Sequence, residues 1–280
     1  MADAIVGNTQ LGATKQALIS AVVQKEIAFK AMLAGVVKNV SEFAVPDALS
    51  IGFPKLTSFT ATNRASGATG DATVLTSSVE TLALSLKPYI AWLGDSNDVI
   101  QSTLAFEMEA AKRAASAAGR YLDSAIIAAL EADAEPLVAT GNITRDIVLD
   151  MREYLLENEG EDMSLIVSVD QEKELLKIAE FSRQDYYGGE VIKSGQIGSL
   201  YGIPVIRSNA LGATTYYMVA KEGCAFGFQK EFSMSTQAAN EYGVSATRTA
   251  MDALLGVKTL QIDEGTSSAG KSAWIIKDNN

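Results

Sequence analysis

Histidine is absent from the 280-residue sequence, and cysteine occurs once. Because His is the commonest general base and the commonest metal ligand near neutral pH, its absence excludes Ser/His/Asp and Cys/His catalytic sites. The one cysteine, Cys224, cannot form an intramolecular disulfide, and the sequence has no Cys cluster for zinc. Its neighbours Ala225 and Phe226 predict a small buried apolar residue.

Basic residues and long apolar runs are also scarce. The 23 Lys and Arg residues face 34 Asp and Glu residues, and the formal net charge of -11 argues against tight binding to nucleic acid. No apolar run approaches the roughly 18 residues of a membrane span, and the first residues do not resemble a secretory signal. We therefore expect a soluble protein of a reducing cytoplasm, with enough apolar residues, 48%, for a core in two subdomains.

What the sequence does contain is an extended stretch at about residues 54–94 that runs into a long helix. Residues 53–62 and 79–93 are rich in Thr and in large apolar residues, which predicts two strands joined by a polar tip at 63–72. In the second strand, apolar and small or polar residues alternate: Leu82, Leu84 and Leu86 with Thr81, Ala83 and Ser85. A two-stranded ribbon is marginally stable alone, so we expect it to rest on another surface; the alternative is a flexible surface loop.

The helix predicted at about residues 97–132 is Ala-rich and would be about 50 Å long. Its apolar stripe consists of residues spaced by three or four: Ile100, Leu104, Met108, Ala111, Ala115, Ala118, Leu122, Ile126 and Leu130. Alanines at the centre of the stripe would let a sheet or another backbone approach closely. Residues 12–40 carry apolar side chains at helix-like intervals, which predicts an amphipathic N-terminal arm whose apolar face needs covering.

The second half of the sequence mixes helices and strands, and the fold class we expect is α+β. We expect helices at 143–157 and from an N-cap at Asp170 to about residue 181, and strands at 164–169, 203–206, 216–220 and 274–276. Residues 230–263 are expected to form a strand, a loop and a long strand. The loop between the second helix and the strand at 203–206, Ser182 to Gly202, is long enough to indicate a partner or a function.

No group of residues forms a recognisable active site. The segment from Gly195 to Gly202 lacks the spacing of a dinucleotide loop, and turn glycines explain it better. The acidic run Glu157, Glu159, Glu161 and Asp162 indicates a solvated helix end or, as the alternative, a site for a hard cation. We expect Asp123 to pair with a nearby Lys or Arg.

The order of these elements resembles the major capsid (coat) proteins of tailed bacteriophages, whose Hong Kong-phage-type fold shares its core with encapsulins. The resemblance covers about residues 30–263. It is carried by Gly119-Arg120-Tyr121-Leu122-Asp123 in the long helix and by Gly-x-Ile-Gly-x-Leu-x-Gly-Ile-Pro-Val-Ile-x-Ser-Asn at 195–209. It implies the following division: N-terminal arm 1–45, extended-loop hairpin 46–96, spine helix of the peripheral domain 97–138, axial domain 139–229, peripheral-domain strands and return to the axial domain 230–263, and C-terminal tail 264–280.

The resemblance also implies a function: a structural protein without catalytic residues, cofactor or metal, which assembles into hexamers and pentamers of an icosahedral shell. The shell would enclose double-stranded DNA without sequence-specific binding, with portal, scaffolding and decoration proteins as further partners and no membrane. The protein would be assembled in the host cytoplasm and reside in the virion. The alternatives are an encapsulin-like nanocompartment shell and a cytoplasmic α/β enzyme.

Contacts between subunits are implied at three places. The hairpin tip contributes Arg64, Asp71 and Thr73; the loop around the capsomer axis contributes Tyr186, Tyr187 and Gln196, although Tyr186 and Tyr187 could equally pack on their own domain; and the loop between capsomers contributes Asn240, Glu241 and Tyr242. Some relatives join subunits covalently through a Lys at the hairpin tip and an Asn in the peripheral loop, where Asn240 lies in this sequence. Residues 63–78 contain no Lys, so we expect no such cross-link here.

Overall fold

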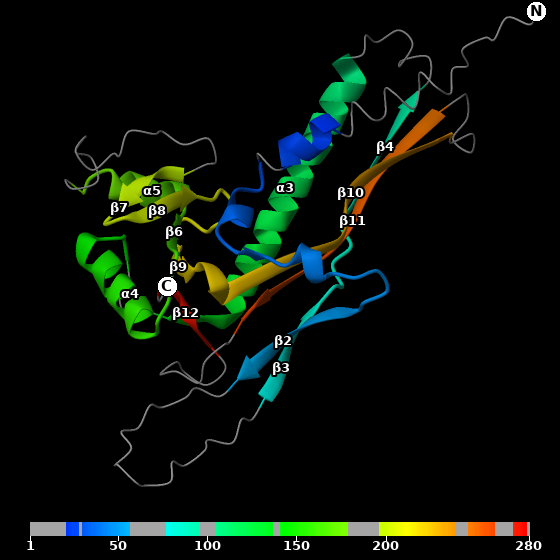
Figure 1. Ribbon diagram of the computed structural model, residues 1–280. Helices are drawn as coiled ribbons and strands as arrows, with labels where there is room; N and C mark the ends of the chain where they lie inside the picture. Colours follow the sequence, from blue (N-terminus) through cyan, green and yellow to red (C-terminus); the bar gives the residue numbers. More distant parts are fainter. Residues whose placement is uncertain are drawn as a thin grey trace, which may run out of the picture.

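Figure 1 shows the computed structural model, which describes residues 21–27, 30–56, 77–95, 105–136, 141–178, 196–238, 246–260 and 271–278. A long helix, α3 (Ala105–Asp133), connects two β-sheets and forms part of the core with both. A separate two-stranded ribbon lies beneath the longer strands in this view. The α+β prediction is confirmed.

The four-stranded sheet has the order β1 (Lys38–Asn39), β10 (Cys224–Ala238), β11 (Ala246–Thr259) and β4 (Tyr89–Asp95). Helix α3 covers one of its faces through the predicted stripe, which is buried at Ala111, Ala115, Ala118, Leu122, Ile126 and Leu130. Ile100 and Leu104 lie outside the described residues. Strand β10 begins at Cys224, earlier than the predicted Lys230, and Cys224 is buried as expected.

The six-stranded sheet has the order β5 (Ala134–Pro136), β12 (Ser272–Lys277), β9 (Tyr216–Ala220), β6 (Met163–Val167), β8 (Ile203–Arg207) and β7 (Gln196–Leu200). Its helices are α4 (Arg145–Glu157) and α5 (Val169–Leu175), and a short 3-10 turn, η3 (Lys221–Gly223), joins β9 to β10. The predicted N-cap at Asp170 is wrong. Ser168 caps α5, because its Oγ accepts the backbone N–H of Gln171 at 3.3 Å.

The ribbon consists of β2 (Ser50–Leu56) and β3 (Ser77–Ala83), paired antiparallel from Ser50–Ala83 to Leu56–Ser77. The predicted antiparallel pairing is thus confirmed, whereas the tip and residues 57–62 lie outside the described residues, and the second strand is not continuous. Residues 77–95 form two strands, β3 and β4, which belong to different sheets. Between them Leu86 exchanges backbone hydrogen bonds with Leu255 at 2.9 and 3.0 Å, and Pro88 has no N–H to extend a ladder.

The N-terminal segment, residues 21–27 and 30–43, packs against the body of the molecule. It is helical at 21–27, then forms a 3-10 turn η1 (Met32–Gly35), the short strand β1 and a second turn η2 (Ser41–Phe43). The helix-like spacing predicted to residue 40 is therefore wrong beyond about residue 30. The apolar face is covered by the same chain, because Val23, Ile27, Leu33 and Val36 are buried in one core with α3.

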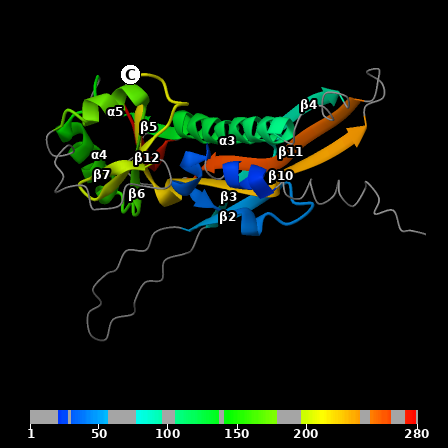
Figure 2. The same cartoon turned by 90° about the horizontal axis from the view of Figure 1, so that it is seen from above.

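Figure 2 shows the resulting layers: α3, then β11 and β10, then the ribbon on the opposite side of the sheet. Neighbouring residues of β10 confirm this order, since Phe226 lies in the core with α3 and Ala225 lies in the cluster with the ribbon. Within the described ranges, no helix is long and apolar enough to cross a membrane.

Candidate assembly surfaces

The ribbon has one buried face and one open face. Ile51 and Leu82 point inward and are buried against Val40 and Ala225. On the other face Val79 is 65% exposed, although a β-branched apolar side chain normally stabilises a strand by packing. The ribbon is therefore seated on its own subunit by one side only.

Gly256 in β11 allows this seating. A Cβ at Gly256 would lie 2.3 Å from the carbonyl oxygen of Ala83 and 2.5 Å from Cδ2 of Leu82. Only glycine permits so close an approach of two backbones. An ion pair between Lys258 and Glu80, at 3.3 Å, adds a second attachment next to it.

The loop that precedes the ribbon carries further exposed apolar residues: Phe43, Val45 and Leu49, the last 86% exposed. Its backbone is fixed by Gln229, whose Nε2 donates to the carbonyl oxygens of Val45 at 3.0 Å and Ala48 at 2.9 Å. Apolar side chains held in the solvent by a fixed loop are typical of a protein interaction surface.

Strand β4 is a second candidate surface, at the edge of the four-stranded sheet. Tyr89 and Leu93 are exposed on it, and the hydroxyl of Tyr89 accepts from Arg248 at 2.6 Å. No strand in the described part of the chain pairs with the outer edge of β4. An unpaired edge strand is able to bind a strand of another chain.

Asp123 attaches the N-terminal segment to α3. It is 7% exposed, and its carboxylate accepts the backbone N–H groups of Leu33 at 3.0 Å and Met32 at 3.3 Å. Burial raises the pKa of Asp123 from 3.8 to about 6, against the opposing effect of the two N–H groups. The expected Lys or Arg partner is wrong, because the carboxylate binds backbone instead. Gly119, one turn earlier, lets the segment approach, since a Cβ there would lie 2.8 Å from Cβ of Lys30.

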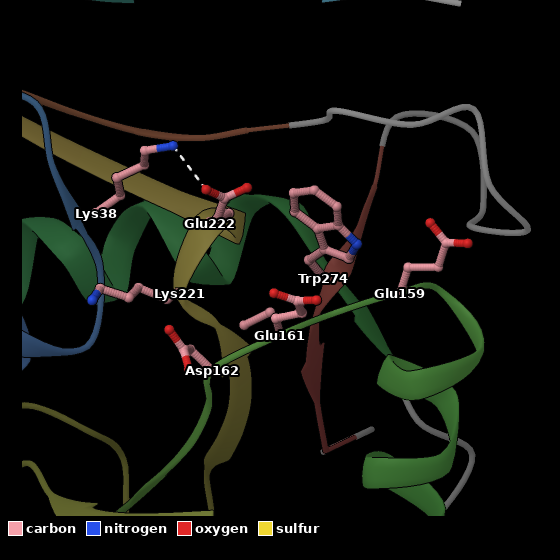
Figure 3. A pocket seen from close by; sticks show the side chains of 8 residues that line it. Lys38, Glu159, Glu161, Asp162, Lys221, Glu222 and Trp274 are labelled. Atoms are coloured by element: carbon pink, nitrogen blue, oxygen red, sulfur yellow. Dashed lines mark hydrogen bonds and ion pairs between the residues drawn. The ribbon is translucent and has the colours of Figure 1, made fainter. Parts of the chain in front are cut away.

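The acidic run lies beside a pocket of about 350 Å³ (Figure 3). Glu159, Glu161 and Asp162 line it together with Lys38 and Trp274. Lys38 pairs with Glu222 at 2.9 Å, and the indole N–H of Trp274 donates to the carbonyl oxygen of Asn158 at 2.7 Å. The described residues contain no group of three or more His, Cys, Asp or Glu side chains that could hold a metal ion.

Two further sequence interpretations are confirmed. Tyr201 and Gly202 form the turn between β7 and β8 with φ values of 52° and 81°, so the glycine-rich segment makes a hairpin turn here. The thiol of Cys224 is buried, which raises its pKa to about 12 and makes it a poor nucleophile at neutral pH.

Most of the contact residues implied by the resemblance lie outside the described residues: Arg64, Asp71, Thr73, Tyr186, Tyr187, Asn240, Glu241 and Tyr242. Gln196 is in β7, where its backbone pairs with Ile206, but its side chain is not described. These nine contacts stay predictions. The sequence does not reveal the roles of Gly256 and Gln229, which position the ribbon and its loop, because their contacts are with residues far away in the chain.

Comparison with known proteins decides the family. Residues 80–232, more than half of the chain, match the family described as phage capsid protein. This chain belongs to the phage capsid protein family. No curated protein matches the sequence.

Solved structures confirm the fold of this phage capsid protein at low sequence identity. Mycobacterium phage Che8 has a TM-score of 0.64 at 16% identity, with 88% of this chain and 90% of that chain covered. The Cyanophage Pam1 capsid has a TM-score of 0.63 at 12% identity, with 90% of this chain and 92% of that chain covered. A virus-like particle from Pyrococcus furiosus has a TM-score of 0.61 at 10% identity, with 94% of this chain and 98% of that chain covered.

These neighbours establish the capsid fold of the Hong Kong-phage type, and the family match identifies a capsid shell protein. The encapsulin alternative is not favoured, because the matching family is that of phage capsids. Fold and family together indicate a structural protein.

Proposed function

We propose that this capsid protein assembles into hexamers and pentamers, and that these close into an icosahedral head around a double-stranded DNA genome. The observation that carries the proposal is the exposed apolar surface of the ribbon and of the loop before it, where Val79 and Leu49 are exposed on a scaffold that its own subunit holds in place. A subunit that leaves such a surface uncovered gains stability when a neighbour buries it.

In this arrangement the ribbon and the tip residues Arg64, Asp71 and Thr73 lie across the adjacent subunit. Tyr186, Tyr187 and Gln196 surround the capsomer axis, and Asn240 to Tyr242 meet the next capsomer. The domain ranges follow the same scheme, with one refinement: β4, inside the range 46–96 of the extended loop, pairs with β11 of the four-stranded sheet.

The charge of the chain fits a container for DNA. A net charge of -11 gives little attraction to phosphates, so packaged DNA would move along the inner wall without adhering. Portal, scaffolding and decoration proteins are the proposed further partners. Assembly takes place in the host cytoplasm, and the protein resides in the virion.

Subunits associate without covalent links, since residues 63–78 contain no Lys to join Asn240 of a neighbour. Boiling purified particles in denaturant and separating the chains by size should give one band at 29.6 kDa. A ladder of multiples would contradict the absence of a cross-link.

Sedimentation velocity of the purified protein tests the assembly itself. The proposal predicts fast, uniform particles that electron microscopy shows as closed shells. A single slow species of one chain, at concentrations where related shells are stable, would contradict it.

A further inference from the structure

The last turn of α3 is attached to both the four-stranded and the six-stranded sheet, which form the two halves of the molecule. Asp133 accepts a hydrogen bond from the hydroxyl of Thr259 at the end of β11, in the four-stranded sheet. Glu131, half a turn earlier, accepts from the hydroxyl of Tyr217 in β9 and from Lys277 Nζ in β12 at 2.9 Å. Both of these strands belong to the six-stranded sheet. We call these five side chains the elbow clamp.

The chain itself passes between the two halves at this point. Helix α3 leads directly into β5, the edge strand of the six-stranded sheet, and η3 joins β9 to β10 within three residues. Lys271, just before β12, donates to the carbonyl oxygen of Ala132 at 2.7 Å. The clamp therefore lies where a change of angle between the halves would be concentrated (Figure 1).

The requirements of a helix do not explain these carboxylates. The C-terminal end of a helix carries partial negative charge, so acidic residues there are unfavourable, and the last turn of α3 has no basic residue. Their contacts explain them instead. Tyr217 is fully buried, and an acceptor stabilises its hydroxyl away from water. Its hydrogen bond, followed by that of Lys277, lowers the pKa of Glu131 and keeps it ionised.

We propose that the elbow clamp fixes the angle between the two sheets and thereby sets the curvature, and so the diameter, of the shell. The proposal rests on the proposed function, because curvature has meaning only in an assembly. When many identical subunits close a surface, a small change of angle in each one changes how many copies are needed. Tyr217 and Thr259 act here as positioning residues through the two carboxylates.

The test compares two adjacent tyrosines. Tyr217→Phe removes the hydroxyl that binds Glu131. Tyr216→Phe is the matched control: Tyr216 is equally buried on the same strand, but its hydroxyl has no hydrogen-bond partner among the described residues. Thr259→Val removes the other attachment. Lys277→Met, at a side chain that is partly exposed, replaces Tyr217→Phe if that variant does not fold.

Electron microscopy of assembled shells gives the first measurement. Wild-type protein and Y216F should form shells of one diameter, whereas Y217F/T259V should raise the fraction of shells outside that diameter at least tenfold. Hydrogen exchange of the amides at 130–133 in unassembled subunits gives the second, and it should be at least tenfold faster in Y217F than in Y216F.

The outcomes separate the two proposals. If wild-type protein forms no shells, the proposed function fails, while the exchange measurement still tests the clamp. If exchange accelerates but the double variant keeps the wild-type diameter, the clamp does not set curvature and the inference is overturned. Equal exchange in Y217F and Y216F would overturn it as well.

Discussion

The N-terminal segment and the ribbon are both expected from the sequence to need another surface that covers them, and the structure covers them to different extents. The apolar face of the N-terminal segment is covered by its own chain, since Leu33 and Val36 are buried in the core with α3. The ribbon buries only one face in this way and leaves Val79 exposed, and the loop before it leaves Leu49 exposed. The first segment thus stabilises the subunit, whereas the second presents apolar area that a single subunit does not cover.

The largest effect is expected from a substitution that disrupts the packing of the ribbon on β11. Gly256→Ala places a Cβ 2.3 Å from the carbonyl oxygen of Ala83, so two backbones must separate. We expect the free energy of unfolding to fall by about 3 kcal/mol, the upper end for overpacking, with faster hydrogen exchange in β2 and β3. Gly35→Ala is the control, because nothing lies within 4 Å of its Cβ position. Equal stability of the two variants would show that the ribbon is not held at this point.

The next prediction concerns the attachment of the N-terminal segment at Asp123. Its folded-state pKa of about 6 exceeds the ordinary 3.8, so the folded state binds the proton more tightly than the unfolded state. Burial of the ionised carboxylate therefore lowers stability above pH 6, and this penalty disappears as the pH falls toward 4. Asp123→Asn has no such titration.

Urea unfolding of both proteins from pH 7 to pH 4 measures this effect. The stability of Asp123→Asn relative to wild-type should decrease by about 2.5 kcal/mol over that range. Other carboxylates cancel in the comparison. A difference that does not change with pH would mean that Asp123 is solvated in solution and does not hold the segment.

Gly119→Ala tests the same attachment through packing. In an exposed helix the change would stabilise by about 1 kcal/mol, but here the new Cβ would lie 2.8 Å from Cβ of Lys30 and 3.2 Å from the backbone nitrogen of Ala31. We expect a net loss of about 2 kcal/mol and faster exchange at residues 31–37, with β2 and β3 unaffected. A gain in stability would contradict the close approach.

The smallest effect on folding is expected from the exposed apolar side chains of the ribbon and of the loop before it. Leu49→Ser with Val79→Thr should change the free energy of subunit unfolding by less than about 0.5 kcal/mol, because both side chains are exposed. The yield of assembled shells, measured by sedimentation, should fall at least tenfold. Shells formed at the wild-type yield would show that these two side chains do not lie in an interface.

Elements set by local patterning are predictable from the sequence. The stripe of α3 and the inward leucines of the ribbon follow their periods closely. The division of residues 77–95 between two sheets does not follow from this two-residue alternation, and Pro88 is its one local signal. A period of two reports which face is buried and not which sheet the strand joins.

The polar contacts were the least predictable part. The Tyr217–Glu131 pair is separated by 86 residues and the Thr259–Asp133 pair by 126, so no local pattern links their members. The one available signal was two carboxylates in the last turn of a helix, where the macrodipole disfavours them. The sequence predicts a paired carboxylate at Asp123, but its backbone partners depend on how the N-terminal segment folds back.

A structure of the assembled shell, determined by single-particle electron cryomicroscopy, tests the central claim most directly. The account predicts that Val79 and Leu49 lie within about 4 to 4.5 Å of apolar side chains of an adjacent subunit, while the inner face of the ribbon stays on its own β11. A shell in which Val79 and Leu49 point to solvent, or in which another part of their own subunit covers them, would contradict the account.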